Sequence, residues 1–396
     1  MENNEIELLQ SKIKEEEAEG YLLLDYESHN EVLTKLLGKA MLTRKVIAFI
    51  PSYGKPTIIL HSIDAGVLKG RPIPFKTEIY NTWEEMLSLE EKLLSPLKGK
   101  KVLMDYSASG LLMRVAKADA GSVEFVKGLG VKVESSANLL QTLVAVLTQR
   151  QYEEELIACK KTLQIKDEAF AFIKSKIESE GETSEYEVQN FIAKRFAEEG
   201  MTYDEPPLVA NGKNASNPHY SPTKDNHSRL LPGDLVLIDM WAKLDDEDGV
   251  YADITWMGYI GEEVPEEYKT RFEVLKKARD GVIEFLNSEL PKRNVMAFEA
   301  DDVARRIIEA EGYGPYFTHR VGHNIAIDLS PHGPGANLDN YETHDDRLLL
   351  EGTSFSDEPG IYAPDFGMRS ETNIHIEDGK PVVVAGRQEE IIAILK

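Results

Sequence analysis

Two strand-like stretches of this chain carry acidic residues where apolar side chains would be expected. The stretch LVLIDMWAKLDDEDGVYADITWMGYI contains Asp239 and Asp253 within its β-rich runs. The stretch SDEPGIYAPDFGMRSETNIHI contains Glu358 just before Pro-Gly and Glu371 among residues typical of a strand. A buried carboxylate costs free energy unless a cation pairs with it. The pattern therefore raises the question of which cation these carboxylates face.

The first stretch is predicted to be a β-hairpin around the acidic turn DDEDG. Asp239 and Asp253 are equally far from Asp246, in the middle of that turn. This symmetry predicts that the two aspartates lie directly opposite each other on one face of the sheet. Directly opposed Cβ atoms are about 5 Å apart, and like charges there are destabilising unless a cation bridges them.

The second stretch has the same symmetry. Glu358 and Glu371 are equally far from Pro364-Asp365, a dipeptide typical of a turn. Any one of the four acids could simply point to solvent, but two hairpins with the same arrangement favour a shared function.

A histidine-rich segment, YFTHRVGHNIAIDLSPHGPG, lies between the two hairpins and contains His319, His323 and His332. Four carboxylates and one imidazole form a hard, oxygen-rich ligand set that suits Mn²⁺, Co²⁺, Fe²⁺ or Zn²⁺. In a two-metal site of this kind, the ions lie roughly 3.5–4 Å apart, activate a bridging water and stabilise the developing oxyanion.

The segments around these hairpins divide the chain into two predicted domains. The first third alternates strands and helices, with strands expected at 45–51, 56–63 and 100–106. We expect this part, residues 1–147, to be an α/β domain. The fold class of the whole chain is predicted as α+β, with residues 148–396 forming the larger domain.

The second domain begins with a helical pattern. Apolar residues from Leu156 to Ile177 follow helical spacing and predict a long amphipathic helix. Further helices are expected after Thr183, over 266–288 and over 300–311, and antiparallel strands between and after them. This segregation of helices from a sheet is typical of α+β folds.

Composition limits the possible functions. The 396 residues include 69 acidic and 45 basic side chains, which gives a formal net charge of -24. Such a surface repels nucleic acid and anionic membranes, so we expect neither as a partner. The lone cysteine, Cys159, excludes a disulfide within the chain, and no apolar run is long enough to span a bilayer. We expect a cytoplasmic protein.

Four short blocks occur in the order found in the "pita-bread" (M24) metallopeptidases, the family of methionine aminopeptidase, aminopeptidase P and prolidase. ANGKNASNPHYSPT resembles the segment with the family's first active-site histidine, and HRVGH, DEPGIY and MRSET resemble the next three blocks. The resemblance extends over about 148–396. The N-terminal residues more loosely resemble the additional domain of the proline-specific and creatinase-like members, which disfavours methionine aminopeptidase.

The resemblance implies a metal-binding role for each of five residues. Asp239 would bind one ion, and Asp253 and Glu371 would bridge two. His323 and Glu358 would bind the second ion, and Glu358 would act as general base toward the bridging water.

The resemblance also implies substrate-binding and catalytic residues. His219 and His332 match two histidines that hold the substrate and stabilise the tetrahedral intermediate. Arg369 could position Glu371 or bind a substrate carboxylate, and Tyr220 could line the pocket. An apparent two-residue insertion before His332 leaves its role open. For His319 a structural role is weighed against a substrate contact, and Trp241 is expected in the core rather than in a pocket wall.

The resemblance implies an exopeptidase with two divalent ions, Mn²⁺ first and Co²⁺, Zn²⁺ or Fe²⁺ as alternatives. It would hydrolyse the Xaa-Pro bond, either of dipeptides, which we favour, or of longer peptides with proline at the second position. A creatinase-like hydrolase without metal and a non-catalytic binding module are the competing hypotheses. Both would be expected to have lost ligands that this chain retains. The family also implies a homodimer.

Overall fold

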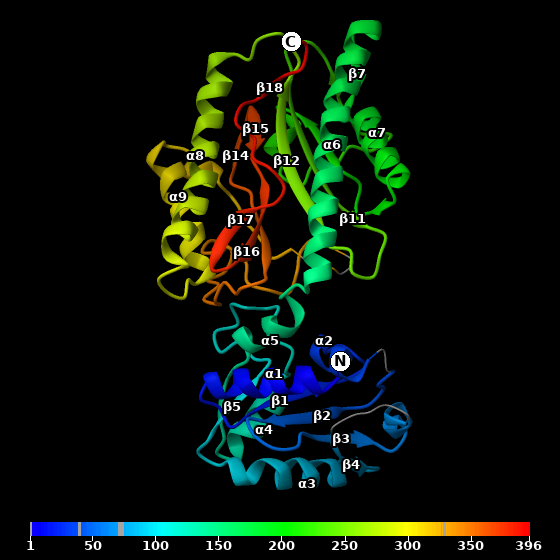
Figure 1. Cartoon of the computed structure of the whole chain (residues 1–396), viewed down its shortest axis with the longest axis vertical. Helices are drawn as coiled ribbons and strands as arrows, with labels where there is room; N and C mark the ends of the chain where they lie inside the picture. Colours follow the sequence, from blue (N-terminus) through cyan, green and yellow to red (C-terminus); the bar gives the residue numbers. More distant parts are fainter. Residues whose placement is uncertain (1, 39–40, 70–74, 326, 328–329) are drawn as a thin grey trace. The chain divides into compact units, whose positions relative to one another are not determined.

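A computed structural model describes residues 2–38, 41–69, 75–325, 327 and 330–396. Its internal contacts divide the chain into two compact units, Met1–Val144 and Ala145–Lys396 (Figure 1). The sequence predicts a domain boundary after residue 147. That the two parts are separate domains with this boundary stays a prediction. No helix among the described residues is both long and apolar enough to cross a membrane.

The N-terminal unit is a mixed sheet with helices on both faces. The sheet has the order β4-β3-β2-β1-β5-β6. Its strands are β1 (Gly20–Asp25), β2 (Val46–Pro51), β3 (Thr57–His61), β4 (Lys76–Tyr80), β5 (Lys101–Met104) and β6 (Lys132–Ser135). The helices are α1 (Glu2–Glu15), α2 (Glu31–Leu37), α3 (Trp83–Leu94), α4 (Ala120–Gly128) and α5 (Ala137–Val144).

The strand β1 shows why this sheet needs two helical layers. Tyr21 and Leu23 are buried in one hydrophobic cluster with α1, α2 and α5, while Leu22 and Leu24 are buried in another with α3 and α4. Successive strand side chains point to opposite faces, so a strand that is apolar throughout must be covered on both.

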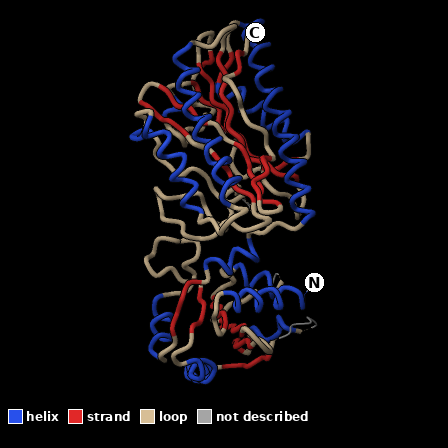
Figure 2. The backbone as a smooth tube through the Cα atoms, turned by 60° about the vertical axis from the view of Figure 1, so that its left-hand side comes forward, coloured by secondary structure: helices blue, strands red, loops and turns tan. Residues whose placement is uncertain are grey.

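The C-terminal unit places strands between two pairs of helices. Figure 1 shows α6 (Gln149–Glu180) and α7 (Glu185–Glu198) on one side, and α8 (Glu266–Glu289) and α9 (Ala297–Ala310) on the other. Figure 2 shows the strands of this unit between helices from a second direction. The helix α6 begins at a capping box, in which the Thr148 hydroxyl accepts from the Gln151 N–H, and ends at Gly181 with φ 81°. The helix α9 begins before the predicted residue 300, because the Glu299 carboxylate caps the Met296 N–H at 2.9 Å.

The described strands of this unit form a central sheet and three smaller ones. The central sheet contains β8 (Met201–Thr202), β9 (Leu208–Asn211), β11 (Leu235–Leu244), β12 (Ala252–Tyr259) and β18 (Ile392–Ala393). A three-stranded sheet pairs β13 (Ser354–Asp357), β16 (Thr372–Glu377) and β17 (Lys380–Val383), and β14 (Gly360–Ala363) pairs with β15 (Phe366–Arg369). Two further short strands, β7 (Thr183–Ser184) and β10 (Arg229–Leu230), pair with each other.

The alternation along β11 directs the acidic residue of this strand to one face. Val236, Ile238 and Met240 pack in the cluster that includes α6 and α7, whereas Leu235 and Leu237 pack toward α8 and α9. Asp239 shares the second face by its position in the strand. The core on both sides therefore fixes which way the carboxylate points.

Candidate active site and metal centre

The hairpin β11–β12 carries both aspartates, but its register differs from the predicted one. Asp239 is opposite Thr255, and Asp253 is opposite Trp241, so the two aspartates are diagonal neighbours. They still share a face, because the shift is an even number of residues. The prediction of direct opposition around Asp246 is therefore wrong.

Tertiary packing explains the shift. Val250 and Tyr251 leave the ladder and are buried in a small cluster with Ile325. On the other strand, Lys243 and Leu244 pair with β8 instead of β12. These contacts lengthen the tip of the hairpin asymmetrically, which turn symmetry alone does not reveal.

The predicted register of the second acidic stretch is confirmed. Asp357 pairs with Thr372, and Gly360 pairs with Arg369, in ladders that share one centre at Pro364-Asp365.

Glu358 and Glu371 occupy the break between these two ladders. Their backbone N–H groups are bound elsewhere: that of Glu358 donates to the Val321 carbonyl at 2.7 Å and that of Glu371 to the Thr255 carbonyl at 3.2 Å. These bonds tie Glu371 to β12 and Glu358 to the segment that carries His323.

His323 lies in the segment after α9 and presents one ring nitrogen to the carboxylates. Its Nδ1 lies 3.1 Å from the Asn324 carbonyl oxygen, while Nε2 lies 3.4 Å from Asp253 and 3.6 Å from Glu358. Burial lowers the pKa of His323 to about 4, so the ring is neutral at neutral pH. With Nδ1–H donating to the carbonyl, the Nε2 lone pair is available as a ligand.

The carboxylates and His323 form a cluster that fits a divalent cation. Ligand atoms of Asp253, His323 and Glu371 all lie within 4.8 Å of one another, and the three residues are buried. Burial and neighbouring carboxylates raise the pKa of Asp253 and Glu371 well above the usual values. Burial raises the pKa of Asp239 to about 7, although Arg369 opposes this shift. The buried carboxylates carry more negative charge than the neighbouring cations offset. Carboxylate and imidazole ligands in such a site suit a hard or borderline divalent ion.

Arg369 is the cation that the chain itself supplies to this cluster. Its Nη2 bonds to Asp239, and its Nε donates to the Thr255 hydroxyl at 2.8 Å and lies 4.0 Å from both Glu358 and Glu371. One guanidinium thus contacts or lies near three carboxylates. It can orient these side chains, but its single positive charge does not offset their combined negative charge.

A further hydrogen bond, to Tyr362, holds the guanidinium of Arg369 in place. Its Nη1 donates to the Tyr362 hydroxyl at 3.1 Å, and that hydroxyl lies 2.8 Å from His319 Nε2. Burial lowers the pKa of His319 to about 3. His319 is not among the described residues that line the pocket. This geometry supports the structural role that was weighed for His319.

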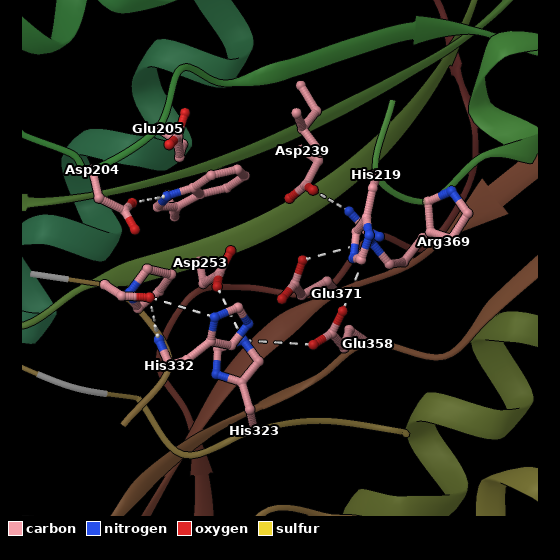
Figure 3. A pocket seen from close by; sticks show the side chains of 15 residues that line it. Asp204, Glu205, His219, Asp239, Asp253, His323, His332, Glu358, Arg369 and Glu371 are labelled. Atoms are coloured by element: carbon pink, nitrogen blue, oxygen red, sulfur yellow. Dashed lines mark hydrogen bonds and ion pairs between the residues drawn. The ribbon is translucent and has the colours of Figure 1, made fainter. Parts of the chain in front are cut away.

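A pocket of about 320 Å³ opens over the cluster (Figure 3). It brings together all the candidate metal ligands with His219, His332 and Arg369. The rings of His332 and His323 are in edge contact, with centroids 4.1 Å apart. His219 lies on the loop after β9, where its N–H donates to the Asn217 side chain at 3.1 Å.

Tyr220 is one of the residues expected to line the pocket. It is not among the described lining residues, and its hydroxyl donates to Glu185 Oε2 at 2.6 Å. It is partly buried and packs against the hydrophobic core, so a substrate-binding role for Tyr220 stays a prediction.

The pocket wall contains Trp241 and further residues that the sequence did not single out. Trp241, expected in the core, lines the pocket, as do Asp204, Glu205, Leu208 and Pro331. The consecutive acidic residues before PPLV were the one visible signal for Asp204 and Glu205, but exposed acids are too common in this chain for that signal to be specific.

Comparisons with known proteins identify the family and agree with the fold. The sequence profile described as metallopeptidase family M24 matches residues 157–378. The chain is 29% identical over 262 residues to an Xaa-Pro dipeptidase of Lactobacillus delbrueckii subsp. lactis, covering 64% of this chain and 65% of that protein. It is 37% identical over 168 residues to an Xaa-Pro dipeptidase of Lactobacillus helveticus, covering 41% of this chain and 40% of that protein. These matches therefore span less than two thirds of either relative.

Solved structures resemble the whole chain at low identity. Dipeptidase PepE from Mycobacterium ulcerans superposes with a TM-score of 0.69 at 20% identity, covering 98% of this chain and 97% of that chain. A prolidase from Thermococcus sibiricus superposes with a TM-score of 0.61 at 23% identity, covering 99% of each. The predicted α+β fold class, with a pita-bread C-terminal domain, is confirmed.

Proposed function

Because the chain belongs to metallopeptidase family M24, we propose that it is a metal-dependent exopeptidase that hydrolyses Xaa-Pro bonds, first of all in dipeptides. The observation that carries this proposal is the pocket in which buried Asp253, His323 and Glu371 converge beside His219 and His332. The similarity to two Xaa-Pro dipeptidases supports the substrate class.

We assign the metal site to Asp239, Asp253, His323, Glu358 and Glu371. Two divalent ions bound there would supply Lewis-acid polarisation of the scissile carbonyl and a more acidic water. Mn²⁺ is our first choice, and this choice, like a homodimeric state, rests on the family resemblance.

Residues of the chain would carry out the proton transfers of the reaction. The Glu358 carboxylate lies at the edge of the cluster, where the Ser356 hydroxyl donates to its Oε1 at 3.1 Å. It is the least buried of the four carboxylates, so it can exchange a proton with water and substrate. We assign it the role of general base that accepts the proton of the attacking water and passes it toward the leaving proline nitrogen.

His219 and His332 would bind and orient the peptide. Both line the pocket at positions outside the ligand cluster, and each can donate a hydrogen bond from a ring nitrogen. Donors that meet the oxygen of the scissile carbonyl stabilise negative charge as it develops. Arg369 would act as a positioning residue, because its guanidinium is already bonded to Asp239 and Thr255.

An Xaa-Pro aminopeptidase acting on longer peptides is the second candidate. Among the described lining residues, Arg369 is the one guanidinium or ammonium group, and it is committed to Asp239. A dipeptide places its carboxylate next to the cleaved bond and would need another cation or a histidine there. A longer peptide has no such requirement.

The experiment is to incubate metal-stripped protein with Ala-Pro and with Ala-Pro-Ala, with and without Mn²⁺, and to measure release of alanine. Metal-dependent cleavage of the dipeptide alone would support the dipeptidase, and cleavage of the tripeptide would support the aminopeptidase. Cleavage of neither peptide with Mn²⁺, Co²⁺, Zn²⁺ or Fe²⁺ would reject the proposed function.

A further inference from the structure

Two acidic residues on the pocket wall have no place in the site assigned above. Asp204 and Glu205 lie in the segment between β8 and β9, are exposed, and line the same pocket as the metal-ligand candidates. Figure 3 places them on the side of the pocket away from Arg369 and Glu358. Across the described part of the chain, no lysine or arginine forms an ion pair with either carboxylate.

Trp241 fixes one of these carboxylates in the wall. Its indole Nε1 donates to Asp204 Oδ1 at 2.6 Å, and Trp241 itself lies directly opposite Asp253 in the β11–β12 ladder. The wall therefore joins an aromatic surface to a carboxylate beside the metal-ligand candidates. An aromatic surface next to carboxylates can contact both the alkyl stem and the cationic head of a long basic side chain.

The charges of the lining residues leave an excess of negative charge on this side. Six carboxylates line the pocket, and Arg369 is the one guanidinium among the described lining residues. Two divalent ions and Arg369 would supply five positive charges, all next to Asp239, Asp253, Glu358 and Glu371. The six carboxylates exceed these five charges by one, and the wall with Asp204 and Glu205 has no lysine or arginine among the described lining residues, so its field attracts a cation and repels an anion.

We propose that Asp204 and Glu205, together with the Trp241 indole, form a subsite that selects substrates whose first residue has a cationic side chain, such as Lys-Pro or Arg-Pro. This inference rests on the proposed Xaa-Pro exopeptidase function and names its substrate class. The α-ammonium group is one bond from the carbon bearing the scissile carbonyl, so it must stay beside the catalytic carboxylates. The side chain is the part of the first residue long enough to reach the opposite wall.

The test compares kcat/KM for Lys-Pro, norleucine-Pro and Glu-Pro. Lysine and norleucine have similar alkyl chains and the same α-ammonium group, so their ratio isolates the side-chain charge. Each exposed carboxylate is expected to contribute about threefold, so wild-type protein should prefer Lys-Pro over norleucine-Pro by roughly tenfold. Glu-Pro should be the poorest substrate of the three.

The variant D204N/E205Q should reduce the Lys-Pro to norleucine-Pro ratio to near one. A ratio cancels any general loss of activity, and a thermal melt checks folding of the variant. The matched control is E262Q/E263Q, which removes two consecutive exposed acidic charges that do not line this pocket. The control should keep the wild-type ratio.

The possible results separate the two proposals. Equal rates on all three dipeptides, or a preference for Lys-Pro that survives in D204N/E205Q, would overturn the subsite while leaving the Xaa-Pro exopeptidase intact. Failure of wild-type protein to cleave any Xaa-Pro peptide would overturn the proposed function, and the preference would fall with it.

Discussion

Two groups of buried carboxylates in the C-terminal unit meet their cations in different ways. Asp301 and Asp345 each have an arginine to themselves. Arg305 donates from Nε and Nη2 to Asp301 at 2.9 and 3.1 Å, and Arg347 donates from the same two atoms to Asp345 at 2.9 and 2.6 Å. These bidentate pairs are complete within the chain.

The carboxylates of the candidate site share a single guanidinium. Asp239 bonds to Arg369, whereas Glu358 and Glu371 lie 4.0 Å from it, and Asp253 lies 3.4 Å from the neutral ring of His323. Burial raises the pKa of Asp239, Asp253 and Glu371 here, as it raises the pKa of Asp301 in spite of Arg305, so the two groups differ in the number of cations per carboxylate. The comparison teaches that the ratio of buried acids to buried cations, rather than burial itself, separates a structural ion pair from a site that requires an external cation.

The largest expected effect is on catalysis. Glu371→Gln should reduce kcat/KM for an Xaa-Pro peptide by about 10³-fold or more, as when a group acting on the reacting atoms is removed. Metal-free protein should lose no stability, because the substitution relieves repulsion among buried acids. Steady-state kinetics and a thermal melt in chelator check both points. The control is Glu377→Gln, an exposed glutamate nearby in the sequence, and equal rates for the two variants would contradict the assignment.

Removing the carboxylate of the Asp345–Arg347 ion pair should reduce the stability of the fold rather than catalysis. Asp345→Asn leaves Arg347 buried without its carboxylate, which should cost about 3–5 kcal/mol of unfolding free energy. Urea denaturation measures the loss, with Asp346→Asn as the exposed neighbour for control. A loss below about 1 kcal/mol would show that the ion pair does not stabilise the fold.

The stabilisation by Mn²⁺ should distinguish the candidate metal site from the structural ion pairs. At a Mn²⁺ concentration about 100 times its dissociation constant, wild-type protein should gain about 2.7 kcal/mol of unfolding free energy. The same addition should give Asp345→Asn a similar gain and Glu371→Gln little or none. If all three proteins respond alike, the ion binds outside the assigned site.

A pH-dependent effect concerns Glu155, a buried acid that no lysine or arginine of the described residues pairs with. The Ser354 hydroxyl donates to it at 2.6 Å, and burial raises its pKa from 4.5 to about 8. The folded protein then holds a proton that the unfolded chain releases, so stability falls as pH rises between these values.

Glu155→Gln should remove this dependence. The stability of the variant relative to wild type should grow with pH by at most about 1.4 kcal/mol per unit and level off above pH 8. Urea denaturation at pH 5, 6, 7 and 8 measures the difference. Parallel curves for the two proteins would mean that Glu155 is ionised in both folded and unfolded states.

The sequence predicted the elements that carry the site better than their exact pairing. The turn at Pro364-Asp365 sets the register of its hairpin, because these two residues alone separate β14 from β15. The longer tip between Asp239 and Asp253 was misjudged, because burial of Val250 and Tyr251 and pairing with β8 are long-range contacts. A local rule predicts register only where local contacts determine it.

The ligand candidates could be named from order and residue type, but the pocket wall could not. His219, His323 and His332 stand in recognisable blocks. Asp204 and Trp241 meet through a hydrogen bond between residues far apart in the sequence, and neither position has an unusual local pattern. Residues of the pocket wall such as these can be identified only when the three-dimensional structure is known.

The most direct test of the central claim is the metal content of purified protein after incubation with Mn²⁺ and removal of free ions. The assigned site predicts about two ions per wild-type chain, a lower content in Glu371→Gln, and Xaa-Pro cleavage that follows the bound metal. Equal metal content in both proteins, or cleavage that persists in fully metal-stripped protein, would contradict a metal centre formed by these carboxylates and His323.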